Sequence, residues 1–129
     1  AEKKKPAAAT PAPAPKTLVR DVSPTDAEKL MAERKDVVVI DVRTIEEYEM
    51  GHIAGAQNVS FIDNGFEEKI GEYAGKPVMI HCAAGNRSLR ALQRMMAGGK
   101  FPEIFHMSGG MAGWQEAGKT VVKTPKAPK

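Results

Sequence analysis

A single cysteine, Cys82, lies at the end of an apolar run and just before a short loop that contains glycine. The run over residues 77–80 predicts a buried strand, and the segment 88–96 has the apolar spacing of a helix. Amides of such a loop can point into one concavity, and the helix start adds partial positive charge, so both a thiolate and a bound oxyanion are favoured. Helix N-termini and nearby cations lower the pKa of a free thiol from about 8.5 to roughly 3.5–7.5. We therefore expect Cys82 to be a reactive thiolate.

Composition alone favours a less reactive cysteine, because a lone cysteine is more often a small buried hydrophobe than a nucleophile. The surroundings of Cys82 reverse that expectation. Gly85 follows three residues later, Arg87 follows five residues later, and a helix begins at once. The apolar face of that helix is expected to carry Leu89, Leu92 and Met96.

Strand and helix patterns alternate along the chain, which predicts an α/β sandwich with a mainly parallel sheet. The unbroken β-branched run at residues 37–42 is typical of a strand covered on both faces. In such sheets ligands bind outside the carboxyl ends of the strands, where Cys82 is expected. The predicted strands are 18–20, 37–42, 56–61, 77–80 and 104–107, and the predicted helices are 24–32, 44–50, 66–72, 88–96 and 111–116.

Three ordered motifs carry a resemblance to a known family. Residues 82–88, Cys-Ala-Ala-Gly-Asn-Arg-Ser, match the form C-x-x-G-x-R-S. Upstream, residues 41–58 look like the segment D-x-R-x-x-x-E-[YF]-x-x-G-H-I-x-G-A-x-N, and downstream, residues 109–114 look like G-G-x-x-x-W. The chain thus resembles the rhodanese family of sulfurtransferases over about residues 18–118.

The resemblance implies a rhodanese-like three-layer sandwich, with a mainly parallel central sheet of about five strands flanked by helices. It also implies that Cys82 takes a sulfane sulfur from a donor such as thiosulfate and holds it as a persulfide. A thiophilic acceptor, cyanide or a thiol, then removes that sulfur, and no metal or organic cofactor is needed. Backbone N–H groups would stabilise the anionic persulfide. The expected substrate-binding residues are Ala83, Ala84, Gly85, Asn86, Arg87 and Ser88.

Two roles are open for Arg87, the only cation of the loop. Its side chain either faces the pocket and attracts an anionic donor, or pairs with a carboxylate such as Asp41 or Glu47 and braces the loop. We favour the bracing role, because a bidentate Arg–carboxylate pair holds a loop rigid. Arg43, in the D-x-R motif, is the other candidate for a loop or substrate contact.

Thiosulfate-preferring members of the family often carry basic residues at the two positions after the cysteine. Here these positions are Ala83 and Ala84, which favours a persulfide or polysulfide as the physiological donor. Sulfur transfer needs no general base once the thiolate is formed, so none of the histidines is expected to be catalytic. His52 is interpreted as a turn residue, His106 as a packing residue of a strand, and His81 likewise receives no catalytic role. The three histidines and one cysteine do not reproduce the spacing of a zinc site.

Two other functions fit the same cysteine. A cysteine phosphatase or arsenate reductase would share the fold and an H-C…R loop, but such phosphatases place five residues between the cysteine and the arginine, and here only four intervene. The shorter loop suits one sulfur atom better than a phosphate. A sulfur carrier or partner-binding module without turnover would use the same cysteine as the enzyme, so sequence does not separate these two.

Length and charge limit the remaining possibilities. The chain has 129 residues and a formal net charge of +3. Its positive charge lies at the two ends, whereas residues 21–118 carry an excess of acidic side chains. Because the basic ends contain no aromatic residue, we do not expect nucleic-acid binding. We predict an Ala/Pro/Lys-rich disordered spacer at 1–16, a rhodanese domain at 17–119 and a flexible basic tail at 120–129.

The expected partners are small sulfur-containing anions or persulfides and a thiol-bearing protein acceptor. No apolar run approaches the roughly 18 residues that suggest a membrane span. We expect a monomer. The Lys/Ala/Pro-rich start without Met is typical of a bacterial protein after removal of a signal peptide, so a periplasmic or secreted location is predicted, with the cytoplasm as the alternative.

Overall fold

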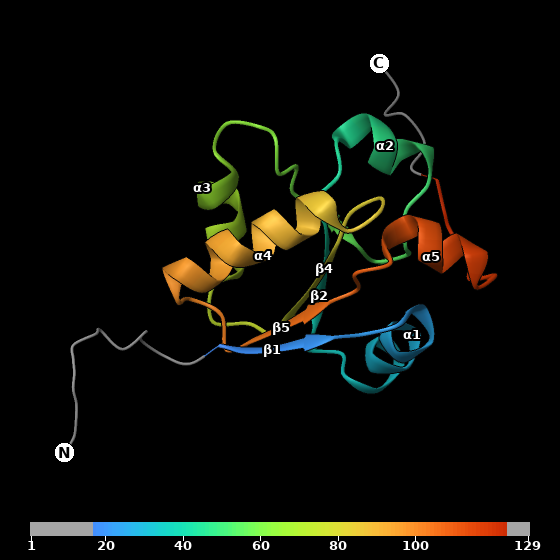
Figure 1. The fold of residues 1–129 in the computed structure, drawn as a ribbon, viewed down its shortest axis with the longest axis horizontal. Helices are drawn as coiled ribbons and strands as arrows, with labels where there is room; N and C mark the ends of the chain where they lie inside the picture. Colours follow the sequence, from blue (N-terminus) through green and yellow to red (C-terminus); the bar gives the residue numbers. More distant parts are fainter. Residues whose placement is uncertain (1–16, 124–129) are drawn as a thin grey trace.

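The structure, a computed structural model, describes residues 17–123, and the predictions for 1–16 and 124–129 lie outside these residues. The described chain forms an α/β fold around a five-stranded sheet whose strand pairs are all parallel (Figure 1). The sheet has the order β1-β5-β4-β2-β3, so β4, the strand before Cys82, is central. The strands are β1 (Leu18–Asp21), β2 (Val38–Asp41), β3 (Gln57–Asn58), β4 (Val78–His81) and β5 (Glu103–His106).

Helices cover both faces of the sheet, which gives the predicted three layers. Figure 1 shows α3 and α4 on one side of the strands and α1 on the other. Buried side chains of α3 and α4 pack with one face of the sheet, and those of α1 and α5 pack with the opposite face. The helices are α1 (Pro24–Glu33), α2 (Ile45–Met50), α3 (Phe66–Ile70), η1 (Gly71–Tyr73), α4 (Asn86–Gly98) and α5 (Gly110–Glu116), where η1 is a 3₁₀ turn.

The central strands are buried on both faces, as the β-branched run predicts. All four residues of β4 are fully buried, and three of the four residues of β2 are buried. Alternate residues of β4 contribute to the two core clusters, Ile80 on the α4 side and Met79 on the α1 side. Burial of this kind stabilises by about 1.5–3 kcal/mol per large apolar side chain, so β4 is a rigid base for the residue that follows it.

The predicted apolar face of α4 is partly wrong. Leu92 is buried, but Leu89 and Met96 are each 46% exposed. The buried stripe instead has the helical spacing i, i+3, i+4, i+7 and is made of Ser88, Ala91, Leu92 and Met95. The small side chains of Ser88 and Ala91 are part of the face that packs on the sheet, so Leu89 and Met96 lie outside the buried stripe.

The strand predicted at 56–61 is shortened to Gln57–Asn58. Two further backbone bonds continue toward β2, from Val59 N–H to the Asp41 carbonyl and from Phe61 N–H to the Val42 carbonyl, both 3.0 Å. β2 itself ends at Asp41, so these bonds join the end of β2 and the residue after it to a segment that is no longer a regular strand.

Polar residues line up where the parallel strands end. Asp21 pairs in register with His106, and Asp41 pairs with His81, so four polar side chains end neighbouring strands of the same sheet edge. Cys82 follows His81 directly and belongs to this row. Parallel strands bring such residues together although they are far apart in sequence.

Residues 121 and 122 contact the rest of the described chain. Val122 forms an isolated antiparallel bridge with His52, and Val121 packs against the core on the α1 side. None of the helices within residues 17–123 is long and apolar enough to cross a lipid bilayer.

Candidate active site

Cys82 lies at the base of a tight loop between the central strand and α4. Its side chain is almost wholly buried, with 1% of the residue exposed. The amide of Gly85 donates a hydrogen bond to Sγ over 3.0 Å, and the hydroxyl oxygen of Ser88 lies 3.3 Å from Sγ. Both contacts come from residues directly after the cysteine, so the loop closes around the sulfur.

Two opposing effects set the pKa of the Cys82 thiol. Burial raises it, whereas hydrogen bonds from the Ser88 hydroxyl and from the amides of Ser88, Gly85 and Ala84 lower it. A hydrogen bond to a charged group is worth about 1.5–3 kcal/mol, so several of them together outweigh the cost of desolvation. The net result is a pKa below the usual value for cysteine, as expected for a thiolate.

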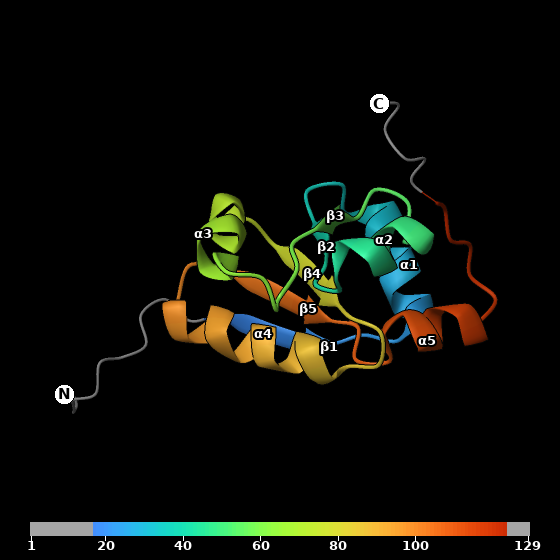
Figure 2. The same cartoon turned by 90° about the horizontal axis from the view of Figure 1, so that it is seen from above.

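The start of α5 orients the amides of this loop. Met111 N–H donates to the Cys82 carbonyl over 2.9 Å, and Ala112 N–H donates to the Ala83 carbonyl over 3.0 Å. Because the peptide unit is planar and trans, each carbonyl that faces α5 turns the next amide, of Ala83 or Ala84, to the opposite side. Figure 2 shows the chain between β4 and α4 lying beside α5. The G-G-x-x-x-W segment thus positions the donors around the cysteine from a distant part of the sequence.

This close approach requires glycine at two positions. Gly110 has a φ of +64°, and a Cβ there would lie 2.5 Å from the Ala83 carbonyl oxygen and 2.6 Å from that of Cys82. Gly85 has a φ of +106°, and a Cβ there would lie 2.5 Å from the Ser108 carbonyl oxygen. These contacts are with backbone atoms that cannot rotate away, so any larger residue displaces the loop.

Arg87 braces the loop from α4. Its guanidinium binds Glu47 of α2 in bidentate fashion, with Nη1–Oε1 at 2.7 Å and Nη2–Oε2 at 3.0 Å. Glu47 also accepts hydrogen bonds from the backbone and side chain of Thr44, in the capping box that begins α2. Chiefly because of Arg87, the pKa of Glu47 is lowered to about 2. This pair is the arrangement that the bracing role predicts for Arg87.

Arg43 does not have the loop contact that was considered for it. Its side chain donates to both carboxylate oxygens of Asp41, with Nη2–Oδ2 at 2.7 Å, and Nη2 also donates to the Gly51 carbonyl over 2.6 Å. Asn58 adds hydrogen bonds to the carbonyls of Asp41 and Arg43. Asp41 and Arg43 therefore hold the chain after β2 in place through hydrogen bonds with each other, Gly51 and Asn58.

The histidines have different surroundings. The ring of His52 stacks on Tyr48 with centroids 3.9 Å apart, and its Nδ1 lies 3.0 Å from the Tyr48 carbonyl oxygen, in line with a structural role. His81 is fully buried, with Nδ1 3.2 Å from the Cys82 carbonyl oxygen, and burial lowers its pKa. His106 is the functional candidate that sequence reasoning missed, because its Nε2 lies 2.7 Å from Ser88 Oγ. Its place at the end of the strand beside β4 is a signal that could have revealed it.

The remaining loop residues are at the surface or near it. Ala84 and Asn86 are exposed and Ala83 is half-buried, and Asn86 begins α4. Within residues 17–123, no group of three or more His, Cys, Asp and Glu side chains is placed to hold a metal ion.

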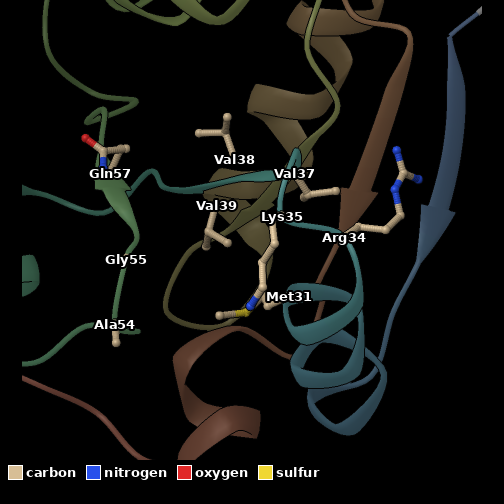
Figure 3. Close-up of a pocket in the computed structure, with 9 residues that line it drawn as sticks. All are labelled: Met31, Arg34, Lys35, Val37, Val38, Val39, Ala54, Gly55 and Gln57. Atoms are coloured by element: carbon tan, nitrogen blue, oxygen red, sulfur yellow. The ribbon is translucent and has the colours of Figure 1, made fainter.

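A hollow of about 320 Å³ lies elsewhere on the molecule (Figure 3). It is lined by the end of α1, the beginning of β2 and the segment before β3, so it lies toward the amino end of β2, away from Cys82. Arg34, one of its basic residues, is bound to Asp36 and Glu103. The lining residues are Met31, Arg34, Lys35, Val37, Val38, Val39, Ala54, Gly55 and Gln57.

Replacing Gly110 with alanine should disturb the loop far more than a similar change elsewhere. We expect Gly110→Ala to reduce the free energy of unfolding by about 3 kcal/mol or more, from positive-φ strain and the clash with two carbonyls. Gly118→Ala is the matched control, because Gly118 has a φ of +76° with nothing within 4 Å of an added Cβ, so about 1 kcal/mol is expected. Denaturant unfolding measures both. Equal losses in the two variants would contradict the close-approach argument.

Removing the Glu47 carboxylate should loosen the loop. We expect Glu47→Gln to slow the alkylation of Cys82 by iodoacetamide at pH 7 several-fold and to cost about 0.5–1 kcal/mol of stability, a modest value because the pair is partly exposed. Glu46→Gln, on the exposed side of the same helix, is the control and should leave both unchanged.

The same pair should make stability depend on pH in acid. The folded pKa of Glu47 is below its unfolded value, so its contribution is present above about pH 4.5 and is lost as the pH falls toward 2. Unfolding of the wild type and Glu47→Gln should therefore converge in that window. A stability difference that persists at pH 2 would disprove the ionic contribution.

Known proteins resemble this chain over most of its length. A family model described as a rhodanese-like domain matches residues 23–117. An uncharacterized protein of Synechocystis sp. is 30% identical over 115 residues, which are 89% of this chain and 58% of that protein, so this chain spans under two thirds of that relative. The thiosulfate sulfurtransferase GlpE of Coxiella burnetii is 31% identical over 103 residues, which are 76% of this chain and 89% of that protein.

A solved structure has the same fold. The polysulfide-sulfur transferase homodimer of Wolinella succinogenes is 26% identical and has a TM-score of 0.66, with 86% of this chain and 83% of that chain covered.

Proposed function

The chain belongs to the rhodanese-like domain family, and from that premise we propose that it moves a sulfane sulfur from a donor to a thiophilic acceptor through a persulfide on Cys82. The observation that supports the proposal most directly is the set of backbone and hydroxyl donors that surround Cys82 Sγ and lower its pKa. Such donors stabilise a thiolate before the reaction and a persulfide anion after it.

The proposed reaction proceeds by two displacements at sulfur. The Cys82 thiolate attacks the outer sulfur of the donor, the donor's S–S bond breaks, and the leaving group departs with the bonding electrons, as sulfite if the donor is thiosulfate. Cys82 then carries an outer sulfur with a negative charge. The acceptor attacks that outer sulfur, and the electron pair of the broken bond returns to Cys82 as the thiolate.

The loop offers little charge to attract a dianionic donor. Ala83 and Ala84 are neutral, and the guanidinium of Arg87 is bound to Glu47. These features support a donor that is a persulfide or polysulfide rather than thiosulfate, and one structural neighbour is named as a polysulfide-sulfur transferase. The same pairing of Arg87 counts against a phosphatase, which would need its arginine at the phosphate.

A sulfur carrier without turnover remains the second reading, since it would use the same cysteine. A thiol-bearing protein acceptor, a monomeric state and a periplasmic or secreted location stay predictions from the sequence.

The persulfide itself is the test of the proposal. After incubation with thiosulfate or a polysulfide, the intact mass of the wild type should rise by one sulfur atom, and cyanide should remove it with formation of thiocyanate. Cys82→Ser should gain nothing, because the chain has no other cysteine. Absence of the added sulfur with every sulfane donor would refute the proposal, and one loading without repeated turnover would favour the carrier.

The donor preference can be tested by adding charge to the exposed part of the loop. Ala84→Arg should lower the KM for thiosulfate roughly fivefold at low salt, and the effect should shrink as salt rises. Ala84→Gln, a neutral side chain of comparable reach, should leave the KM nearly unchanged. The argument fails if both variants behave alike, or if the wild type already saturates at micromolar thiosulfate.

A further inference from the structure

A chain of polar groups links the buried Cys82 to the surface of the molecule. Cys82 Sγ lies 3.3 Å from Ser88 Oγ, which lies 2.7 Å from His106 Nε2. The other ring nitrogen, Nδ1, lies 3.6 Å from Asp21 Oδ1. Cys82, Ser88 and His106 are buried, whereas the side chain of Asp21 is 78% exposed.

We propose that Ser88 and His106 form a proton relay that takes the thiol proton of Cys82 and holds it on the imidazole ring while the sulfur is an anion. The relay rests on the proposed function only because it concerns the same cysteine: it describes how the Cys82 thiol loses its proton. His106 acts through Ser88 and does not touch Sγ, so it is a positioning residue of the site.

The transfer balances with a single proton. In the thiol state the Cys82 S–H donates to Ser88 Oγ, and the Ser88 O–H donates to His106 Nε2. In the charged state the proton of the thiol resides on Ser88 Oγ, the former hydroxyl proton resides on His106 Nε2, and every donor along the chain points toward the thiolate. The products are a thiolate and an imidazolium, joined by one hydroxyl, and no other reactant is consumed.

The surroundings of His106 suit this role. The Asp21 carboxylate near Nδ1 favours a proton on that nitrogen, which leaves Nε2 free to accept from Ser88 when the ring is neutral. The 2.7 Å contact to Nε2 is also shorter than the 3.2 Å from Ser88 Oγ to the Gly85 carbonyl oxygen, the competing acceptor for the hydroxyl proton.

Other charges near the ring act in both directions. Asp21 on β1 and His81 on β4 act on His106 directly, and Cys82 in the loop is joined to it through Ser88. Burial lowers the pKa of His106 and Asp21 raises it, and the net pKa is below the usual value for histidine. His81 is itself kept neutral by burial, so it does not compete for the proton.

The decisive experiment titrates the thiolate without any sulfur donor. The ultraviolet absorbance of the thiolate and the rate of alkylation by iodoacetamide both report on Cys82 alone, because it is the only cysteine. In His106→Gln the side chain can still hydrogen-bond Ser88 but cannot hold the proton, and alkylation at pH 7 should fall about tenfold with the thiolate curve displaced to higher pH. Ser88→Ala should show at least this loss. His52→Gln, which changes another buried histidine outside the relay, should match the wild type.

A second variant, at the surface, tests the relay even if the buried substitution His106→Gln prevents folding. Asp21→Asn lies at an exposed position and should slow alkylation two- to threefold at low salt, because the imidazolium loses its nearby carboxylate. If His106→Gln does not fold, this variant decides the question, and an unchanged rate overturns the relay.

A reciprocal measurement separates the relay from a packing role. The nitrogen chemical shifts of His106 should titrate at lower pH in Cys82→Ser than in the wild type, because the thiolate no longer stabilises the imidazolium. Identical titrations of His106 in the two proteins, or an unchanged thiolate curve in folded His106→Gln, would overturn the proposal. Neither titration involves sulfur transfer. The relay can therefore be disproved while the proposed function stands, and the proposed function can be disproved while the relay stands.

Discussion

Two backbone hydrogen bonds from the start of α5, to the carbonyls of Cys82 and Ala83, determine the electrostatics of the loop. If those carbonyls turned inward they would place negative ends of peptide dipoles beside the sulfur and disfavour an anion there. With the carbonyls held outward, the amide of Ala84 is among the donors to the sulfur. Other residues hold α5 in the position that these two hydrogen bonds require. Trp114 anchors α5 in the core, where its Nε1 donates to the Thr120 carbonyl, and Gly110 allows the close approach.

Ion pairs hold the segments next to the loop in place. In each pair a carboxylate neutralises the arginine, so neither arginine presents an unpaired positive charge to Cys82. Arg87 is matched by Glu47, and Arg43 is matched by Asp41. The cradle around Cys82 is therefore built from peptide amides and one hydroxyl rather than from cations. In the proposed reaction the charge moves from the cysteine sulfur to the outer sulfur of a persulfide, and amide donors with fixed positions need not reorganise for that change. A rigid, uncharged cradle suits the proposed function, in which the site accepts and releases the same anion.

The sequence was informative where a property depends on local order. The β-branched run of β2, the strand before Cys82 and the order of the three motifs were enough to predict the sheet and the nucleophile, and the structure and the family match confirm the fold. Features that depend on tertiary contact were not predicted. The face of α4 that packs on the sheet includes the small residues Ser88 and Ala91. A search for large apolar side chains overlooks such residues and so places the buried face wrongly.

The hydrogen-bond and ion-pair partners of individual side chains could not be predicted from the sequence either. Glu47 was one of two possible partners for Arg87, and only the position of α2 decides between it and Asp41. His106 had no neighbour in sequence to suggest a function, because it meets Ser88 only through the pairing of β4 with β5 and the placement of α4 above them. Position at the carboxyl edge of the sheet was the usable signal, and it requires the strand order to be known.

In the proposed reaction, the loop amides hold the sulfur that Cys82 carries. The most direct measurement is a crystal structure of the protein after loading with a sulfane donor. We expect continuous density for a second sulfur on Cys82 Sγ, within hydrogen-bonding distance of amides between Ala84 and Ser88, with the carbonyls of Cys82 and Ala83 still bound to α5. A second sulfur that points away from these amides into solvent, or a loop whose carbonyls have left α5, would contradict the account.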